Sequence, residues 1–292
     1  MCRRCGAWKG SLGLEPTPTL YIRHVCDIFD EVRRVLKQQG TLWVIIGDTY
    51  GGSWGNYGAR NGRQRRANST PFVRKGSPPA ALRPPSASVQ PKSLCLIPSR
   101  FAIEMARRKW VLRNEIVWWK PNCLPSSARD RFTVDFEKLL FFVKAKRYHF
   151  EQQLEPYTGP INRWGGQIMD REGAKVRRYT EINCIGSTSC LRGGADLRPC
   201  TRGRNMRTVW RIPVQACPDA HFASFPERLV ETPIRAGCPE GGIVLDPFVG
   251  SGTSVVVARR LGRRYIGVDI NEAYCKMARA RLARGGSLKA LE

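Results

Sequence analysis

The segment that most constrains this chain is Ile243–Ser254, which reads Ile-Val-Leu-Asp-Pro-Phe-Val-Gly-Ser-Gly-Thr-Ser. Its apolar start predicts a strand, Asp246 falls at the carboxyl end of that strand, and Gly250 and Gly252 predict a tight turn into a helix. In α/β proteins such a strand, turn and helix meet at the carboxyl edge of a parallel sheet, where nucleotide-like ligands bind. The sequence therefore predicts an α/β fold with a ligand crevice at this turn.

A second carboxylate narrows the choice of ligand. Asp269 ends the next predicted strand, 23 residues after Asp246, where an acid that binds ribose hydroxyls is expected. A dinucleotide fingerprint would need glycine in place of Val255, and the Gly-Lys-Ser/Thr of a phosphate-binding loop is missing. Asp246 would repel phosphate but suits a ligand with a cationic amino-acid end, such as S-adenosylmethionine. The alternative is an ordinary tight turn that binds nothing.

Periodicity and capping residues predict the other elements. The N-terminal part is expected to hold a helix capped by Thr17, a buried parallel strand over 41–48, a helix of 99–109 capped by Ser99, and strands over 111–119 and 137–143. The last third is expected to hold a capping box at 224–227 with a helix to 236, strands 243–245 and 264–269, a helix of 252–261, and a final helix capped by Asn271.

Charge points to a nucleic-acid partner. The chain has 49 Lys and Arg against 24 Asp and Glu, a formal charge of +25. Arginine-rich genome composition is the alternative explanation. No stretch is apolar enough for a membrane span and the N-terminus lacks a signal-peptide core, so a soluble, cytoplasmic protein is expected. The eleven cysteines favour reduced thiols; Cys2 and Cys5 could form half of a zinc site, although a non-metal role is the better-supported alternative.

Two basic segments are candidates for DNA contact. The Gly-, Pro- and Ser-rich stretch 51–92 predicts a long loop, in which Arg63, Arg65 and Arg66 are interleaved with aromatic residues. A second run without acidic residues contains Arg202 and Arg204. For both, a solvated surface loop is the alternative.

The segment Leu245–Ser254 resembles the S-adenosylmethionine motif of the amino-group DNA methyltransferases, which methylate adenine N6 or cytosine N4. Similar segments extend over most of the chain, at Gly13–Thr17, Gly40–Tyr50, Leu112–Asn122 and His221–Val230. The resemblance implies a Rossmann-like methyltransferase sheet of the α/β class in the β-type motif order, with an inserted target-recognition region. Its implied parts are a catalytic half over 1–149, the recognition region over 150–208 and a cofactor-binding half over 209–292.

The resemblance also implies the reaction and its residues. The expected activity is methyl transfer from S-adenosylmethionine to an exocyclic amine in duplex DNA, and a homodimer and a cognate restriction endonuclease are the expected protein partners. The host is expected to be prokaryotic or the gene phage-encoded. Cofactor-lining residues are expected to be Asp246, Phe248, Gly250, Gly252, Thr253 and Asp269, with Phe225 and Pro226 on the methionine moiety; Lys120 joins the DNA-contact candidates. Rival interpretations are an inactive DNA-binding remnant and a methyltransferase for RNA or protein.

One departure from the family pattern concerns catalysis. Members carry a Ser/Asp/Asn-Pro-Pro-Tyr/Phe tetrapeptide, expected before Gly13, and none of the twelve preceding residues fits it. The similar string Ser77–Ala80 lacks the aromatic residue that would stack on a flipped base. The simplest interpretation is that Met1 is an internal start; the chain alone is then expected to be dimeric or poorly soluble and inactive, and an upstream extension to restore activity. Otherwise Asp48 and Tyr50 are the first catalytic candidates.

Overall fold

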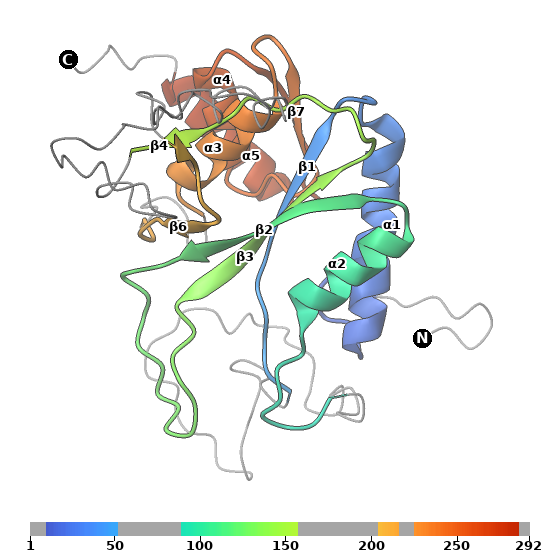
Figure 1. The fold of residues 1–292 in the computed structure, drawn as a ribbon, viewed down its shortest axis with the longest axis vertical. Helices are drawn as coiled ribbons and strands as arrows, with labels where there is room; N and C mark the ends of the chain where they lie inside the picture. The colour runs from blue at the N-terminus through green and yellow to red at the C-terminus, as the bar shows by residue number, and fades with distance from the viewer. Residues whose placement is uncertain (1–9, 52–88, 157–203, 216–224, 286–292) are drawn as a thin grey trace, which may run out of the picture. The chain divides into compact units, whose positions relative to one another are not determined.

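The computed structural model describes residues 10–51, 89–156, 204–215 and 225–285, which belong to two compact units (Figure 1). Unit 1 comprises residues 1–148 and unit 2 comprises residues 149–292. Each unit packs helices on strands, as expected of the predicted α/β class. The division into catalytic, recognition and cofactor-binding parts stays a prediction.

Three strands of unit 1 form an antiparallel arrangement. Helix α1 (Pro18–Val35) leads into β1 (Thr41–Ile46), and helix α2 (Ile97–Arg107) leads into β2 (Val111–Trp119) and β3 (Phe136–Val143). Strand β3 lies between β1 and β2 and is antiparallel to both. Strands β1 and β2 therefore run in the same direction, and their carboxyl ends lie at the same edge of the sheet.

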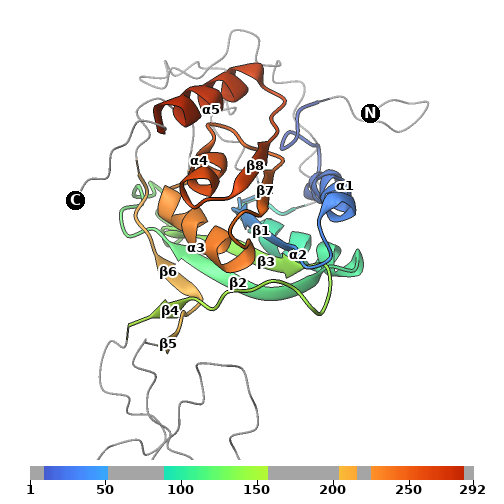
Figure 2. The ribbon, with the colours of Figure 1, turned by 90° about the horizontal axis from the view of Figure 1, so that it is seen from above.

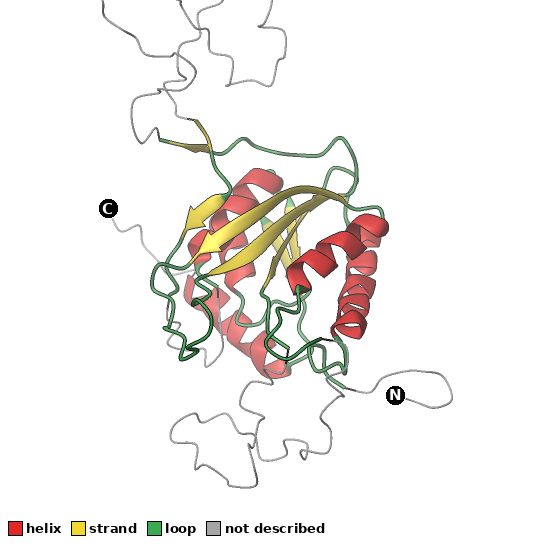
Figure 3. Ribbon diagram, turned by 60° about the horizontal axis from the view of Figure 1, so that its bottom comes forward, coloured by secondary structure: helices red, strands yellow, loops and turns green. Residues whose placement is uncertain are grey.

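The core of unit 1 explains why α1 and α2 form. The Thr17 side chain caps α1 by accepting from the Leu20 N–H at 3.2 Å, as predicted, and Pro18 occupies the first turn. Helices α1 and α2 bury their apolar faces against β1 and β3 (Figure 3). Phe101 of α2 meets Phe142 of β3 edge to face at a ring distance of 6.0 Å.

Two sequence predictions for unit 1 were wrong. Strand β1 is not a parallel strand buried at every position, because it pairs antiparallel with β3 and its burial alternates. The residues of β1 on the other face are partly buried, and Trp43 there stacks on its cross-strand neighbour Phe141 at 4.0 Å, so the apolar run is continuous. Helix α2 begins at Ile97 rather than after Ser99, because Asp48 Oδ1 accepts from the Ile97 N–H at 3.1 Å and so supplies a cap from 49 residues away.

Unit 2 holds a parallel strand pair with helices packed on it. Its elements are β4 (Leu154–Glu155), β5 (Arg204–Asn205), β6 (Val209–Arg211), α3 (Glu227–Gly237), β7 (Ile243–Asp246), α4 (Thr253–Arg260), β8 (Arg264–Gly267) and α5 (Glu272–Gly285). Strands β7 and β8 pair in parallel, with Asp246 opposite Gly267. Helix α4 packs against both strands and against α3 and α5 (Figure 2). The predicted strand–helix–strand unit is therefore present.

Helix starts in unit 2 show one correct and one wrong cap prediction. Asn271 caps α5 as predicted, because its Oδ1 accepts from the Ala273 N–H at 3.0 Å. Helix α3 begins after Pro226, which stands at the cap position without a side-chain hydrogen bond, so the helix starts two residues later than the capping box at 224–227 predicts. Ser224 itself lies outside the described residues.

None of the described helices is both long and apolar enough to cross a membrane. Cysteines of unit 1 include Cys26 and Cys95, both buried in the core. Burial raises the pKa of the Cys26 thiol to about 12, so this side chain is a neutral, small apolar group at neutral pH.

Alkylation of the native protein is therefore expected to distinguish buried from accessible thiols. Cys26 and Cys95 should resist iodoacetamide at about pH 8, whereas Cys123, Cys238 and Cys275, which are partly exposed, should react. Peptide mass spectrometry before and after unfolding in urea measures both groups. Reaction of Cys26 in the native protein at the rate of Cys275 would contradict the described core.

Candidate functional site

The turn between β7 and α4 has the backbone that its glycines predict. Gly250 has φ +49° and Gly252 has φ +89°, both in the left-handed region that favours glycine. Gly252 is the residue directly before α4, so the turn leads directly into the N-terminus of this helix. The backbone N–H groups of the turn thus lie at the carboxyl end of β7, together with Asp246.

Asp246 holds the first half of the turn. Its Oδ1 accepts from the Phe248 N–H at 2.9 Å, and its Oδ2 accepts from the Ser254 hydroxyl. The carboxylate thereby joins the end of β7 to the first turn of α4. A carboxylate has about four lone-pair positions, so Asp246 keeps acceptor capacity for a further donor.

Asp269 holds the second half of the turn from beyond β8. Its Oδ2 accepts from the Gly250 N–H at 3.0 Å, and its Oδ1 accepts from the Asn271 N–H at 2.8 Å. The Val249 N–H also donates to the Val268 carbonyl at 2.9 Å. The structure therefore brings the two predicted carboxylates to one turn, where both bind its backbone or its flanking residues.

Glycine suits positions 250 and 252 for different structural reasons. A Cβ on Gly252 would lie 2.7 Å from the Ala278 Cβ of α5, so this position is needed for helix packing. A Cβ on Gly250 would meet nothing nearer than the Phe248 carbonyl at 3.9 Å, so the space above Gly250 is open. The sequence predicted close approach of a ligand at both glycines, and the structure leaves room for it at Gly250.

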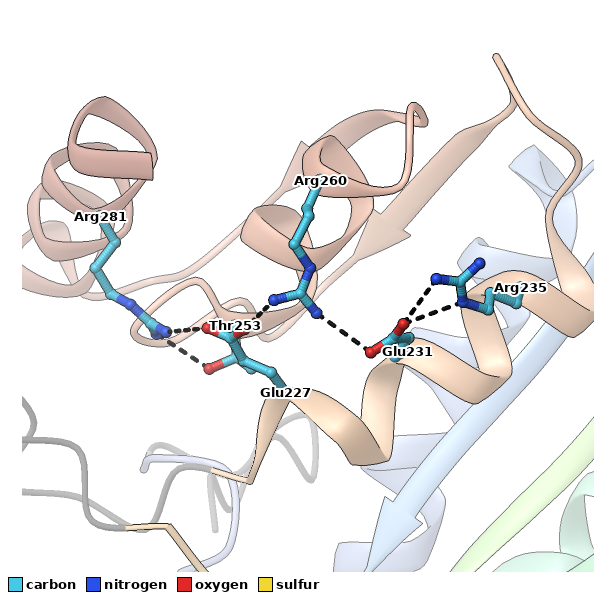
Figure 4. A network of polar contacts seen from close by, with 6 residues as sticks. All are labelled: Glu227, Glu231, Arg235, Thr253, Arg260 and Arg281. Atoms are coloured by element: carbon cyan, nitrogen blue, oxygen red, sulfur yellow. Dashed lines mark hydrogen bonds and ion pairs between the residues drawn. The ribbon is translucent and has the colours of Figure 1, made fainter. Parts of the chain in front are cut away.

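Arg281 of α5 was not predicted from the sequence, although its side chain contacts the turn at several points (Figure 4). One of its terminal nitrogens, Nη1, lies 3.0 Å from the Ser251 carbonyl and 3.1 Å from Thr253 Oγ1. The other, Nη2, lies 3.5 Å from Glu227 Oε1. The Arg281 side chain is largely buried, since only 19% of it is exposed.

The same contacts connect the turn to α3. Glu227 also pairs with Arg260 at 2.6 Å, and Arg260 reaches Glu231 at 3.3 Å (Figure 4). This network links α3, α4 and α5 through side chains that the strand–turn–helix motif does not predict. The signal that could have located Arg281 is its spacing: it follows Ala278 by three residues, on the face of α5 that meets Gly252.

The remaining predicted cofactor residues differ in exposure. Phe248 is 46% exposed, so its ring is open to a ligand, whereas Pro226 is buried and Phe225 is partly buried. Thr253 is buried, and its hydroxyl accepts a hydrogen bond from Arg281. The arrangement thus offers carboxylates for hydroxyl or ammonium groups, an open backbone position and an aromatic face.

The predicted catalytic and DNA-contact residues in unit 1 make specific contacts. The Asp48 carboxylate binds the N-terminus of α2, and the Tyr50 ring centroid lies 3.6 Å from the Arg131 guanidinium carbon. Lys120 pairs with Glu137 and lies 4.4 Å from the Trp118 ring centroid. The structure therefore places Lys120 in contacts within unit 1, and its role toward DNA stays a prediction.

Arg204 forms an ion pair in unit 2. Its Nε lies 2.8 Å from Glu155, which Arg207 also contacts at 2.5 Å. Burial alone would raise the pKa of Glu155, but the hydrogen bonds from Arg207 and Arg204 outweigh it and hold that pKa below its usual value. The other candidates for DNA or metal contact lie outside the described residues: Arg63, Arg65, Arg66, Arg202, Cys2 and Cys5.

Among the residues that the structure describes, no three His, Cys, Asp or Glu side chains gather as metal ligands would. The candidate site in unit 2 is built instead from carboxylates, backbone groups and an aromatic ring.

Comparison with known proteins identifies the class to which this fold and site belong. The model of the N6/N4 methyltransferases, described as DNA methylase, matches residues 9–280. The chain belongs to this family. Membership confirms the predicted amino-group DNA methyltransferase, an enzyme that uses S-adenosylmethionine.

Individual relatives agree with this assignment. Type II methyltransferase M.SmaI of Serratia marcescens is 33% identical over 277 residues, which cover 94% of this chain and 78% of that protein. In fold, the chain is similar to the PvuII DNA methyltransferase, described as cytosine-N4-specific, with a TM-score of 0.56 and 16% identity over 90% of this chain and 71% of that one. A Thermus thermophilus protein, described as a DNA modification methylase and solved with S-adenosyl-L-methionine, gives a TM-score of 0.51 and 19% identity, covering 98% and 86%.

Arg281 is expected to stabilise the turn measurably. Replacing Arg281 with Ala removes a largely buried, charge-assisted set of contacts and should lower the free energy of unfolding by about 1–3 kcal/mol. The matched control is Arg279→Ala on the exposed face of the same helix, which should change it by less than about 0.5 kcal/mol. Urea unfolding followed by circular dichroism measures both. Equal effects of the two substitutions would contradict the structural role of Arg281.

Proposed function

We propose that unit 2 binds S-adenosylmethionine at the turn between β7 and α4, and that the protein methylates an exocyclic amino nitrogen of cytosine or adenine in duplex DNA. The observation that carries this proposal is the convergence of Asp246 and Asp269 on one glycine turn, in a chain of the DNA methylase family. The relatives' descriptions as Type II methyltransferases support DNA as the substrate.

The residues of the turn fit this cofactor. Asp269 would accept from the ribose hydroxyls with the lone pairs left by its two backbone contacts, and Asp246 would bind the ammonium group of the methionine moiety. The open space at Gly250 leaves room for a ligand against the backbone, and the exposed Phe248 ring offers a surface for the adenine. Each of these features is present in the turn as folded.

When bound there, S-adenosylmethionine would supply a methyl group activated by its sulfonium sulfur. The amine nitrogen would take the methyl carbon as the carbon–sulfur bond breaks, with S-adenosylhomocysteine as the leaving group, one amine proton lost to solvent and no covalent enzyme intermediate. The chain's own contribution at this turn is to orient the cofactor. The hydrogen bonds of Asp246, Asp269 and Arg281 fix the turn before the ligand arrives, which lowers the ordering cost of binding.

We also propose the wider setting of a restriction–modification pair in a prokaryotic or phage-infected cytoplasm. A cognate endonuclease fits the Type II relatives. The formal charge of +25 supports an anionic partner. The same proposal includes a homodimer. It also includes contacts with DNA made by Arg63, Arg65, Arg66, Arg202, Arg204 and Lys120.

Asp269→Ala is expected to weaken S-adenosylmethionine binding at least tenfold. The loss of a charge-assisted hydrogen bond costs ~1.5–3 kcal/mol, and the Gly250 N–H also loses its acceptor. Glu272→Gln is the matched control, because Glu272 is an exposed carboxylate that pairs with Lys276 on α5. Titration calorimetry measures both affinities. Unchanged affinity in Asp269→Ala would remove this residue from the proposed site.

Methyl transfer tests the reaction itself. The 292-residue chain and a form extended by the upstream reading frame are incubated with labelled S-adenosylmethionine and duplex DNA, RNA or protein. Label is expected on DNA in at least one form, and nucleoside analysis then identifies N4-methylcytosine or N6-methyladenine. Label on RNA or protein alone would contradict the proposed substrate. Binding of the cofactor and DNA without transfer in either form would favour the inactive remnant.

A further inference from the structure

The connection between β2 and β3, residues 120–135, forms a loop that extends beyond the ends of both strands (Figure 1). It carries an exposed cluster that mixes apolar and cationic side chains. Phe132 is 95% exposed, Leu124 is 90% exposed and Val134 is half exposed. Arg129 and Arg131 are exposed beside them. We call these five residues the β2–β3 tip.

The apolar side chains of the tip are not buried in the core of unit 1, so core packing does not explain why these positions are apolar. Single exposed apolar residues are common on proteins, but Leu124, Phe132 and Val134 line one hollow of about 210 Å³. Tyr50 and Leu94 form part of the same wall. Pockets for drug-sized ligands start at about 300 Å³, so this hollow is a small depression of the surface.

Contacts with neighbouring segments of unit 1, and one within the connection, hold the tip in place. The Arg131 guanidinium carbon lies 3.6 Å from the Tyr50 ring centroid, which ties the tip to the segment after β1. Lys92 pairs with Asp130 at 2.6 Å, and the Ser126 N–H donates to the Thr133 hydroxyl at 3.4 Å. Phe132 is therefore exposed on an anchored segment.

The tip lies at an edge that the sheet topology defines. Strands β1 and β2 run in the same direction, so Tyr50, after β1, and the connection after β2 meet at their shared carboxyl edge. Asp48, which follows β1, also lines the hollow. The tip thus stands beside Asp48 and Tyr50, the alternative catalytic candidates of the sequence.

We propose that the β2–β3 tip contacts duplex DNA and that Phe132 stacks on a base left exposed when a neighbouring nucleotide is unpaired. Arg129 and Arg131 would neutralise phosphates beside the inserted ring. The inference rests on the proposed function in taking DNA as the substrate. Apolar wedges enter opened base steps, and aromatic rings stack on unpaired bases of any sequence.

Charge favours DNA over a second copy of this chain as the occupant. Joining two tips would bring Arg129 and Arg131 of both copies together, and these like charges would repel one another. A polyanion with aromatic faces matches both the cations and the exposed ring. Self-association through the tip is a measurable outcome of the test.

The test uses a duplex of about 30 base pairs with one abasic position and the same duplex fully paired. Binding of the full chain is measured by fluorescence anisotropy at several salt concentrations. The wild-type chain should prefer the abasic duplex by about tenfold, because the gap is already unstacked. Phe132→Ala should lose this preference, Phe132→Trp should keep it and show quenched tryptophan fluorescence on binding, and Ile103→Ala, an exposed apolar residue of α2, should keep it unchanged.

The exposure of Phe132 means that its replacement leaves the core intact, which circular dichroism checks. An abasic preference equal in Phe132→Ala and wild type would overturn the proposal, as would its absence in the wild type. A change of oligomeric state in Phe132→Ala with unchanged DNA binding would also overturn it and assign the tip to self-association. Because binding is measured without methyl transfer, a failed methylation assay would count against the proposed function alone.

Discussion

The arrangement of unit 2 depends on two carboxylates that accept hydrogen bonds from backbone N–H groups of a single turn. Asp246 accepts a hydrogen bond from the Phe248 N–H and Asp269 accepts one from the Gly250 N–H, so the turn is fixed both from the end of β7 and from the residues after β8. Without these acceptors the N–H groups would need water or a ligand, and the positive φ angles at Gly250 and Gly252 would be less firmly held. The parallel pairing of β7 with β8 places the carboxylates where they can do this.

Packing around the turn extends this constraint to the helices. Gly252 allows Ala278 of α5 to approach closely, and the same approach brings Arg281 to the Ser251 carbonyl. Arg281 in turn meets Glu227 at the start of α3. In this member of the DNA methylase family, backbone hydrogen bonds, helix packing and ion pairs thus support the turn together. Cofactor contacts at the turn would use groups that the fold has already positioned.

Local sequence signals predicted the elements whose determinants are close in sequence. The cap at Thr17, the cap at Asn271 and the strand–turn–helix around Asp246 all depend on residues within a few positions of one another. The start of α2 was mispredicted because its cap comes from Asp48, far away in the sequence. Periodicity also cannot distinguish a parallel strand from an antiparallel strand with apolar residues on both faces, which is the case for β1.

The candidate site was predictable to the extent that its determinants lie in one segment. Asp246, Gly250 and Asp269 were identified because acids and glycines at this spacing have a defined chemistry. Arg281 was missed because its spacing from Ala278 identifies it only once the contact of Ala278 with Gly252 is known. The exposure of Phe132 likewise depends on the path of the β2–β3 connection, which the sequence does not reveal.

Amide hydrogen exchange at Phe248 and Gly250, in the protein without cofactor, tests most directly whether the turn is formed in advance. If Asp246 and Asp269 hold the turn before binding, both amides should exchange at least about tenfold more slowly than in the unfolded chain, as expected for charge-assisted hydrogen bonds. Exchange of both amides at the unfolded-chain rate, slowed only after S-adenosylmethionine is added, would contradict a turn formed in advance.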